Sequence, residues 1–311
     1  MKSIRAFAPA TCANVACGFD ILGFAVETPG DEVKLTLVDS PGVTIKSITG
    51  DEGKLSHESD KNTVSLVIQQ YLTAINRQDV GVEIELTKNM PLKSGLGSSA
   101  ASSVVGVYAL NKLLGEPLTD KELLPFAMEG ELLACGSAHA DNVAPALLGG
   151  FVLVRSYEPL DVIQLPTPKK LWATIIHPHI EVKTKDARSI LRKDIKLKDA
   201  VVQWGNVAGL VTGLLKEDYD LIGRSLQDVI VEPIRSLLIP GFEEVKAKAI
   251  HAGALGCSIS GSGPSIFALS LDQETAYKIG QEMTAVFDDL NVASEVYISK
   301  VSEQGPIILK D

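Results

Sequence analysis

A glycine-rich segment that leads into an apolar helix is the first candidate for chemistry in this chain. Glycines at positions 95 and 97 allow backbone conformations closed to other residues and let a ligand approach the N–H groups closely. Serine hydroxyls at positions 98 and 99 can cap free N–H groups at the helix start, where the helix dipole favours an anion. The segment therefore predicts a polyphosphate site, formed by Pro91, Leu92, Lys93, Ser94, Gly95, Leu96, Gly97, Ser98, Ser99, Ala100 and Ala101.

Two better-known glycine loops do not account for this segment. The P-loop pattern GxxxxGK[ST] requires a lysine between the last glycine and the serine, and this sequence has none there. The pattern GxGxxG/A of dinucleotide-binding folds matches residues 95–100 only nominally. A seven-residue link with Pro91 separates these glycines from the strand-like run 80–87, and Glu116, about 20 residues on, lies in a Gly-Glu-Pro turn. We therefore exclude both classes.

The full string PLKSGLGSSAA resembles the central ATP-binding motif of the GHMP kinases, a family of galacto-, homoserine, mevalonate and phosphomevalonate kinases. The resemblance implies ATP as the phosphoryl donor and adds Asn62 to the nucleotide-binding residues. It also implies an α+β, two-domain GHMP kinase fold. An ATP-binding domain similar to domain 2 of ribosomal protein S5 is expected over residues 1–165, and a ferredoxin-like α/β sandwich over residues 166–311.

A phosphoryl-transfer enzyme needs a metal, because catalysis is mainly positioning and electrostatic stabilisation. Mg²⁺ takes hard oxygen ligands, usually one or two from the protein beside the phosphates. Members of the family pair the second serine of the motif with a downstream glutamate, so the resemblance implies Ser99 and Glu131 as Mg²⁺ ligands. From the residues alone, Glu129 is equally eligible, and either glutamate could be an exposed helix residue.

Three polar residues follow within four positions, just before a glycine pair and an apolar run. His139, Asp141 and Asn142 lie between a predicted helix and a predicted strand, which is typical of a functional loop. The alternative is structural: His139 could cap the helix and the other two could form an Asx-turn. The segment resembles the homoserine kinase form, with its histidine three residues before the asparagine, and this favours a role in substrate binding.

The amino-terminal run from Ala8 to Ala25, with Asn14 and Gly-Phe-Asp20, is a second resemblance to the homoserine kinases. An amino alcohol acid needs an acidic partner for its ammonium group, and Asp20 fits that role. Its carboxylate suits a planar guanidinium. Arg188 and Arg235 match the arginines that homoserine kinases use, although each alone could be a solvated surface residue.

A third family motif contains Gly261 and Gly263 on either side of a serine. From the residues alone it predicts a tight hairpin turn between two short strands. In the family this loop packs beside the phosphate motif and supports it, so the resemblance implies a supporting role for both glycines.

The residue that takes the proton of the acceptor hydroxyl is left open by the sequence. Asp141 lies where mevalonate-type members carry a base, whereas homoserine kinases are thought to work without one. A loose transition state needs little deprotonation before attack. We therefore expect Asn14, Asn142 and Asp20 to orient the hydroxyl, while loop donors and Mg²⁺ stabilise the γ-phosphoryl group.

The resemblance as a whole implies phosphorylation of L-homoserine by ATP, giving ADP and O-phospho-L-homoserine, a step of threonine biosynthesis. One alternative is another GHMP kinase that acts on a different small alcohol. A second is a nucleotide-binding regulator built on the same fold. The Asp20, Arg188 and Arg235 set argues against the first, and retention of Ser99 with Glu131 argues against the second.

Composition agrees with a globular enzyme of small molecules. The chain has 311 residues, 45% of them hydrophobic, and a net charge of −10 without a long basic cluster, which argues against nucleic acid. Four cysteines without a CxxC spacing indicate reduced thiols in a cytoplasmic protein. A signal peptide or membrane span is not expected, because long apolar runs are missing. The expected partners are L-homoserine and ATP, and the sequence leaves a homodimer open.

The elements that must position these residues follow from hydrophobic periodicity. In the first half we expect strands over 31–38, 43–48, 80–87 and 150–155, and helices that begin at Asn62, Ser98 and Asp120. The third of these helices requires Pro125 in its first turn. After a proline-rich stretch at 165–170, we expect strands over 171–177, 257–260, 265–270 and 293–299, and helices over 199–215, 218–231, 242–252 and 273–288.

Overall fold

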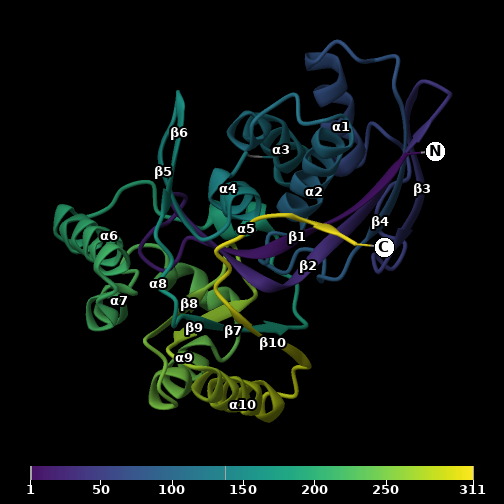
Figure 1. Ribbon diagram of the computed structural model, residues 1–311. Coiled ribbons are helices and arrows are strands. Elements are labelled where there is room, and N and C mark those ends of the chain that lie inside the picture. Colours follow the sequence, from purple (N-terminus) through teal and green to yellow (C-terminus); the bar gives the residue numbers. More distant parts are fainter. Residues whose placement is uncertain (1, 137, 311) are drawn as a thin grey trace.

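The computed structural model describes residues 2–136 and 138–310 (Figure 1). Within these residues the strands form two sheets. The first has the order β11-β1-β2-β4-β3, and β5 joins it by pairing with β2 and with β6. Its strands are β1 (Ser3–Ala13), β2 (Leu22–Val38), β3 (Gly42–Thr49), β4 (Gly81–Thr87), β5 (Phe151–Tyr157), β6 (Leu160–Leu165) and β11 (Ile307–Leu309). The second sheet is antiparallel, with the order β10-β7-β9-β8, and consists of β7 (Trp172–Pro178), β8 (Gly256–Ile259), β9 (Ile266–Ser270) and β10 (Ser294–Lys300).

Helices cover both sheets (Figure 1). Four helices gather beside the first sheet: α1 (Thr63–Ala74), α2 (Ser98–Leu113), α3 (Asp120–Cys135) and α4 (Ala140–Leu148). Two pack on the second sheet: α9 (Phe242–His251) and α10 (Gln273–Asp289). Between β7 and α9 the chain forms α5 (Thr184–Ser189), α6 (Leu197–Lys216), α7 (Tyr219–Ser225), α8 (Glu232–Arg235) and the 3-10 turn η1 (Ser236–Leu238). The expected α+β, two-domain GHMP kinase fold is confirmed.

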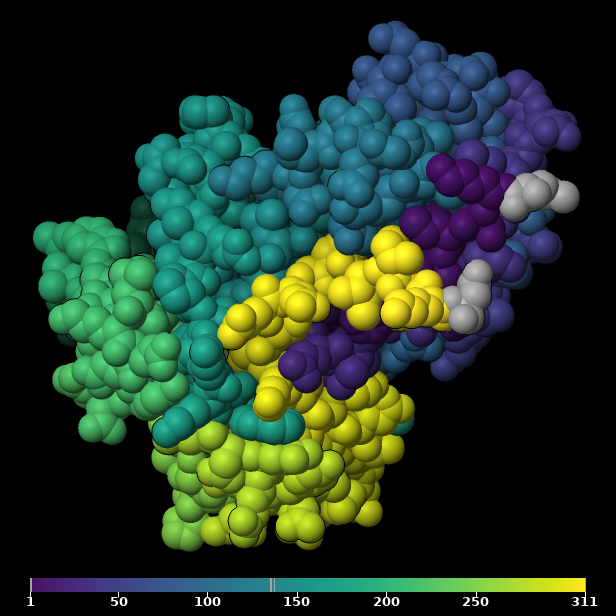
Figure 2. Space-filling view, viewed as in Figure 1, coloured from purple at the N-terminus to yellow at the C-terminus, as the bar shows by residue number. Residues whose placement is uncertain are grey.

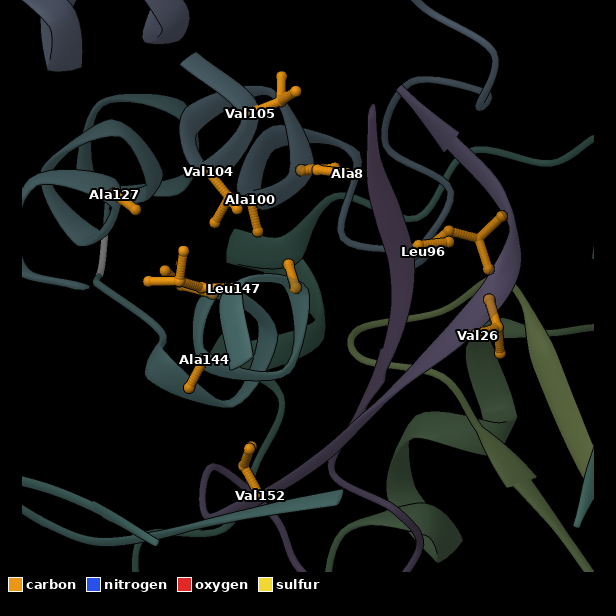
Figure 3. Packing of buried hydrophobic residues seen from close by; sticks show 14 of the residues in the cluster. Ala8, Val26, Leu96, Ala100, Val104, Val105, Ala127, Ala144, Leu147 and Val152 are labelled. Carbon is orange, nitrogen blue, oxygen red and sulfur yellow. The ribbon is translucent and has the colours of Figure 1, made fainter. Parts of the chain in front are cut away.

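Helix α2 is buried on nearly all sides, because it packs against β1, β2 and three other helices. Its small residues make this possible. A Cβ on Gly106 would stand 2.7 Å from the Val64 side chain, and a Cβ on Gly130 of α3 would stand 2.2 Å from Ser103 Oγ. Figure 3 shows Ala100 and Val104 of α2 close to the α4 residue Leu147. The core therefore holds the first turn of α2 in a fixed position.

The expected helix over 218–231 is wrong in its second half, because α7 ends at Ser225. The carboxylate of Asp228 accepts hydrogen bonds from the backbone N–H groups of residues 230, 231 and 232 at 2.9 Å each. This local pairing replaces helical hydrogen bonds and starts the separate short helix α8.

Two further expectations about helices need correction. Pro125 lies inside α3 as its sixth residue, not in its first turn, so the helix continues across one missing hydrogen bond. The polar cluster around His139 is not a loop: His139 is the N-cap of α4, and Asp141 and Asn142 lie in its first turn. Ser137, in the same run, lies outside the described residues.

The end of the chain returns to the first sheet, which the sequence did not indicate. Strand β11 pairs with β1 and adds an edge strand to the sheet that is otherwise built from residues 3–165. In Figure 2 this last segment, in yellow, lies over the purple and violet strands of that sheet. A division of the chain after residue 165 therefore stays a proposal. None of the described helices is both long enough and apolar enough to cross a lipid bilayer.

Candidate active site

The glycine-rich segment forms a tight turn that ends at the start of α2, as the sequence predicts. Gly95 and Gly97 have φ angles of 83° and 66°, in the left-handed region that favours glycine. A Cβ at position 97 would lie 2.1 Å from Thr11 Oγ1, and one at position 95 would lie 2.5 Å from the Ser260 carbonyl oxygen. Both glycines are thus required by the approach of neighbouring protein atoms as well as by the turn.

The serines at the helix start do not act as caps, contrary to the sequence expectation. Gly97, which has no side chain, is the N-cap of α2. The Ser98 hydroxyl instead donates to Asp31, and the Ser99 hydroxyl donates to Glu131. The capping positions of the first turn are therefore not filled by these hydroxyls, and the positive end of the helix dipole is available for an anion.

Lys88 and Asp31 form a buried ion pair behind this turn, which the sequence analysis missed. The Lys88 side chain is 2% exposed, and its ammonium group donates to the Ser98 carbonyl oxygen at 2.9 Å and to Ser102 Oγ at 2.6 Å. Burial lowers the pKa of Lys88, and the charge of Asp31 opposes that shift. The alternation of side chains along the strands could have indicated this pair. Lys88 continues the series of inward-facing residues of β4, and Asp31 lies on the inward face of β2. The pair ties β2 and the end of β4 to the first turn of α2.

Ser99 and Glu131 lie in contact, with 2.6 Å between the hydroxyl oxygen and a carboxylate oxygen. Glu131 is 4% exposed, whereas Glu129, which the sequence left equally eligible, lies on the surface of α3. A hydroxyl and a carboxylate are hard oxygen donors of the kind Mg²⁺ takes. Among the described residues there is no group of three or more His, Cys, Asp or Glu side chains that could hold a metal. The pair fits a metal that keeps most of its ligands from phosphate and water.

His139 lies between this pair and the residues expected to bind the acceptor. Its Nδ1 is 4.0 Å from a carboxylate oxygen of Glu131, and its Nε2 is 2.7 Å from Nη2 of Arg188. A guanidinium only donates, so Nε2 accepts. Burial and then the charge of Arg188 lower the pKa of His139, which favours the neutral imidazole. One side chain thus connects the two halves of the site.

Asp20, Arg188 and Arg235 converge around the ring of Phe19. Both Asp20 oxygens accept from Arg188, at 2.9 and 3.0 Å. The guanidinium carbons of Arg188 and Arg235 lie 5.4 and 4.9 Å from the centre of the Phe19 ring. Burial lowers the pKa of Arg235 to about 10, so it keeps its charge at neutral pH. The three charged residues predicted from separate parts of the sequence therefore lie in one cluster.

Asn14 holds the turn that carries Asp20. Its Oδ1 accepts from the Asp20 backbone N–H at 3.1 Å, and its Nδ2 donates to the Gly261 carbonyl oxygen at 2.6 Å. Asn14, Val15, Ala16 and Asp20 all have positive φ angles, a strained arrangement for residues with side chains. Such strain persists where the surrounding structure fixes it, and it is frequent at functional sites.

The loop with Gly261 and Gly263 joins β8 to β9, so the hairpin reading is confirmed. It also touches the glycine-rich segment. Ser260 Oγ donates to the Gly95 carbonyl oxygen at 2.7 Å, and the Ser265 N–H donates to the Ser94 carbonyl oxygen at 3.2 Å. The Gly261 carbonyl oxygen also accepts from Arg235 at 2.9 Å. These contacts agree with a supporting role for both glycines, which remains a prediction.

Asp141 and Asn142 point from the first turn of α4 toward the same region. Asp141 is buried, and this burial, followed by the charges of Asp20 and Glu131, raises the pKa of its carboxyl group to about 8. Its Oδ1 is a buried atom without a hydrogen-bond partner among the described residues. Asn142 accepts a hydrogen bond from Thr11 Oγ1 at 3.0 Å.

Asn62 lies at the start of α1, and its amide group is engaged within its own segment. Oδ1 accepts from the Val64 N–H at 3.1 Å, and Nδ2 donates to the Ser56 carbonyl oxygen at 2.9 Å. It is thus the helix cap that the sequence indicated, and its contact with a nucleotide stays a prediction. Pro91 and Leu92 line a cleft of about 500 Å³ whose far wall is formed by the second sheet.

Comparisons with known proteins agree with this geometry. Residues 62–150 match the family described as GHMP kinases N terminal domain, and residues 210–289 match GHMP kinases C terminal. A homoserine kinase of Chlorobium phaeobacteroides is 54% identical, and the match covers 99% of this chain and 100% of that protein.

Solved structures give the same result. The crystal structure of homoserine kinase from Cytophaga hutchinsonii has a TM-score of 0.97 and 67% identity, and the match covers 99% of this chain and 98% of that one. The mevalonate kinase of L. major, at 16% identity and a TM-score of 0.73 with 95% of each chain covered, shares the fold. This chain therefore belongs to the homoserine kinases of the GHMP kinase family.

Proposed function

We propose that this chain transfers the γ-phosphoryl group of ATP to the hydroxyl of L-homoserine, giving ADP and O-phospho-L-homoserine for threonine biosynthesis. The observation that carries the proposal is the position of His139. It contacts the Arg188 guanidinium on one side and faces the Glu131 carboxylate on the other. The side chain of His139 therefore bridges a site for an amino acid and a site for a metal-bound phosphate.

Recognition of the acceptor follows from the charges in the cluster of Asp20, Arg188 and Arg235. The ammonium group of homoserine pairs with Asp20, and its carboxylate pairs with Arg188 and Arg235, whose planar forks can each bind two oxygens. Asp20 and Arg188 bind each other in this structure, so a zwitterion that binds to this cluster exchanges one internal ion pair for two intermolecular ones. A neutral sugar or a mevalonate without an ammonium group cannot make that exchange.

The donor half of the site is the turn at residues 95–99 with the start of α2. Its backbone N–H groups and the helix dipole favour the phosphates of ATP. Ser99 and Glu131 would hold Mg²⁺, which when bound neutralises charge on the phosphates of the donor. The retained contact between these two side chains argues for an enzyme over a nucleotide-binding regulator on the same fold.

We propose that no carboxylate base removes the hydroxyl proton before transfer. With a pKa of about 8, Asp141 is mostly protonated at neutral pH and donates a hydrogen bond more readily than it accepts a proton. Asn14, Asn142 and Asp20 then orient the hydroxyl. As its oxygen forms the bond to phosphorus and the bond from phosphorus to ADP breaks, the hydroxyl proton passes to an oxygen of the transferred phosphoryl group. A loose transition state makes this order of events feasible.

The assignment of substrate is tested by ADP release from ATP with homoserine, mevalonate, galactose and shikimate as acceptors, at equal concentrations with Mg²⁺ present. We expect stimulation by homoserine alone. Stimulation by another alcohol, with none by homoserine, would leave the family in place and refute the substrate. Replacing ATP with GTP in the same assay measures the nucleotide preference.

The compartment in which the reaction takes place is inferred from the cysteines. Cys12, Cys17 and Cys257 are buried free thiols, and burial raises the pKa of the Cys12 thiol to about 12, which makes it unreactive. Free thiols favour a reducing compartment, so we propose a cytoplasmic enzyme. We also propose that it works as a homodimer.

A further inference from the structure

Helix α6 carries a stripe of exposed apolar residues along its full length. Gln203, Leu210 and Leu214 face the protein on the opposite side of the helix. Leu197 is 71% exposed and Trp204 is 61% exposed, values far above those of buried core residues. The stripe consists of the exposed Leu197, Val201, Trp204, Ala208 and Leu215 and of Val211, which is half-buried and packs partly against the core. Figure 1 shows α6 at the edge of the molecule, and in Figure 2 the same green segment forms a protruding flank.

The spacing of the stripe is that of a helix that packs against another helix. Its members follow one another at intervals of four, three, four, three and four residues, the heptad pattern of a coiled-coil seam. The positions of the stripe are symmetric about residue 206, so that each member has a counterpart at the same distance on the other side. In an antiparallel pair of α6 helices, Leu197 therefore meets Leu215, and Trp204 meets Ala208.

The residues near the centre of the stripe are suited to such a pair. The indole ring of Trp204 is the largest side chain of the stripe, and Ala208, its counterpart across the axis, is the smallest. Gly205 lies on the flank of the stripe, and nothing stands within 4 Å of where its Cβ would be. A glycine inside a helix lowers helix stability, and here no neighbour within the chain requires it. The small residues leave room for the ring and backbone of a second helix.

Charges at the two ends of α6 are opposite in sign. Arg192, Lys193, Lys196 and Lys198 are exposed at its amino-terminal end and outnumber the acidic Asp194 and Asp199 there, so that this end is basic in net charge. Glu217, Asp218 and Asp220 are exposed just beyond its carboxyl-terminal end and outnumber Lys216 of the last turn, so that this end is acidic in net charge. An antiparallel pair brings the basic end of each helix to the acidic end of the other, and it also aligns the helix dipoles favourably.

We propose that a second copy of this chain binds to this stripe, with the two α6 helices antiparallel about a twofold axis at the level of Asn206. Strand β6 contacts α6, and its Ile163 is 41% exposed, so the hairpin of β5 and β6 extends the apolar surface toward the size a stable interface needs. The contact is isologous, since the same residues serve on both copies. It specifies the surface of the homodimer proposed above, but it does not depend on which acceptor the enzyme uses.

Sedimentation equilibrium of the full chain and of two variants tests the proposal. The unaltered protein is expected at twice the chain mass of 33.1 kDa. Trp204→Glu is expected to sediment at the chain mass, with unchanged far-UV circular dichroism and unchanged ADP release. Val202→Glu is the matched control, because Val202 is exposed on the same helix but off the stripe, and it is expected to stay dimeric. A monomeric unaltered protein, or a Trp204→Glu variant that stays dimeric, overturns the proposal.

Cross-linking decides the orientation of the helices. A mixture of Trp204→Cys and Ala208→Cys chains is expected to form a disulfide-linked pair under mild oxidation, because these positions face each other. A mixture of Val202→Cys and Ala208→Cys chains is expected to form none. Equal yields from the two mixtures, or linkage only between like positions, contradict the antiparallel pair. Both experiments leave the active site unaltered, so failure of this interface and failure of the proposed reaction are distinguishable.

Discussion

Arg188 of α5 binds both carboxylate oxygens of Asp20, a residue 168 positions earlier in the chain, at 2.9 and 3.0 Å. The same guanidinium donates to His139, and it lies over one side of the Phe19 ring. Planar, bidentate geometry of this kind belongs to arginine, since a lysine ammonium acts as a point charge. If Arg188 binds the acceptor as proposed, the geometry of its guanidinium, and not its charge alone, is what recognition requires.

Arg188→Lys is therefore expected to raise the KM for homoserine by about 10- to 100-fold, the effect of losing one charge-assisted bidentate contact of roughly 1.5–3 kcal/mol. The KM for ATP should change less than threefold, because Arg188 belongs to the acceptor half of the site. Initial-rate kinetics with each substrate varied in turn measures both constants.

Arg192→Lys is the matched control, since Arg192 lies four positions further on and is exposed. Its KM for homoserine should equal that of the unaltered protein. If both variants raised that constant equally, the effect would come from the segment as a whole and the assignment of Arg188 would be wrong.

The second prediction concerns Glu131, whose carboxylate lies 2.6 Å from the Ser99 hydroxyl. Glu131→Gln keeps the shape of the side chain but removes the charge that a divalent cation needs. We expect kcat to fall by about 100- to 1000-fold, as when one electrostatic stabiliser of a transition state is removed. The Mg²⁺ concentration for half-maximal rate should rise in parallel, which a titration at saturating ATP measures.

Glu129→Gln supplies the control for this change, because it alters the exposed glutamate two residues earlier on the same helix. Its rate and its Mg²⁺ requirement should match those of the unaltered protein. The reverse result, with Glu129 sensitive and Glu131 tolerant, would reassign the metal ligand.

The sequence predicted most of the fold because hydrophobic periodicity is local. Strands such as β4 and helices such as α10 began and ended within a residue or two of the expected positions. It failed where a polar side chain or a distant segment decides the outcome. Asp228 ends the helical region after α7 by binding three backbone N–H groups, and β11 forms where the end of the chain pairs with the distant β1.

The site was predictable in its parts and not in its connections. Motif residues such as Gly97 and Ser99 are neighbours in sequence, so their shared role could be inferred from spacing. The contact between Arg188 and His139, by contrast, joins residues 49 positions apart that lie on different elements. The Lys88–Asp31 pair was missed because a charged residue at a strand end is usually exposed, and only its position on the inward face indicated otherwise.

That buried pair gives the third prediction. Lys88→Met removes the cation and leaves Asp31 charged in a buried position, so we expect the free energy of unfolding to fall by about 3–5 kcal/mol. Urea denaturation followed by circular dichroism measures the loss. The double change of Lys88→Met with Asp31→Asn should recover part of it, because no uncompensated charge remains.

Lys46→Met is the comparison for Lys88→Met, since Lys46 forms an exposed ion pair with Glu83 on the same sheet. Exposed pairs contribute little, so a loss of less than about 1 kcal/mol is expected. If Lys46→Met and Lys88→Met lowered the free energy of unfolding equally, burial of the Lys88–Asp31 pair would make no difference to its contribution to stability.

The fourth prediction tests the absence of a base. Asp141→Asn preserves the size of the side chain and its ability to donate a hydrogen bond. If the carboxyl group is protonated at pH 7, kcat should stay within about tenfold of the unaltered value, because a general base contributes more than that, typically 100- to 10,000-fold. A loss of several orders of magnitude in the steady-state rate would sink the mechanism proposed above and make Asp141 the base.

The fifth prediction follows from the pKa of about 8 at Asp141, which is raised from the ordinary value of 3.8 by burial first and by two neighbouring carboxylates second. Between these pH values the native state holds a proton that the unfolded state has lost. The contribution of Asp141 to stability is therefore fully present below pH 4 and is lost as pH rises through 8, at up to about 1.4 kcal/mol per pH unit. The Asp141→Asn variant has no such titrating proton. From pH 5 to 8 the free energy of unfolding of the unaltered protein should therefore fall relative to that of the variant, and above pH 8 the difference between the two should stay constant. Urea denaturation of both proteins at each pH measures the difference, and a constant difference over that range would show that Asp141 is ionised in the folded protein.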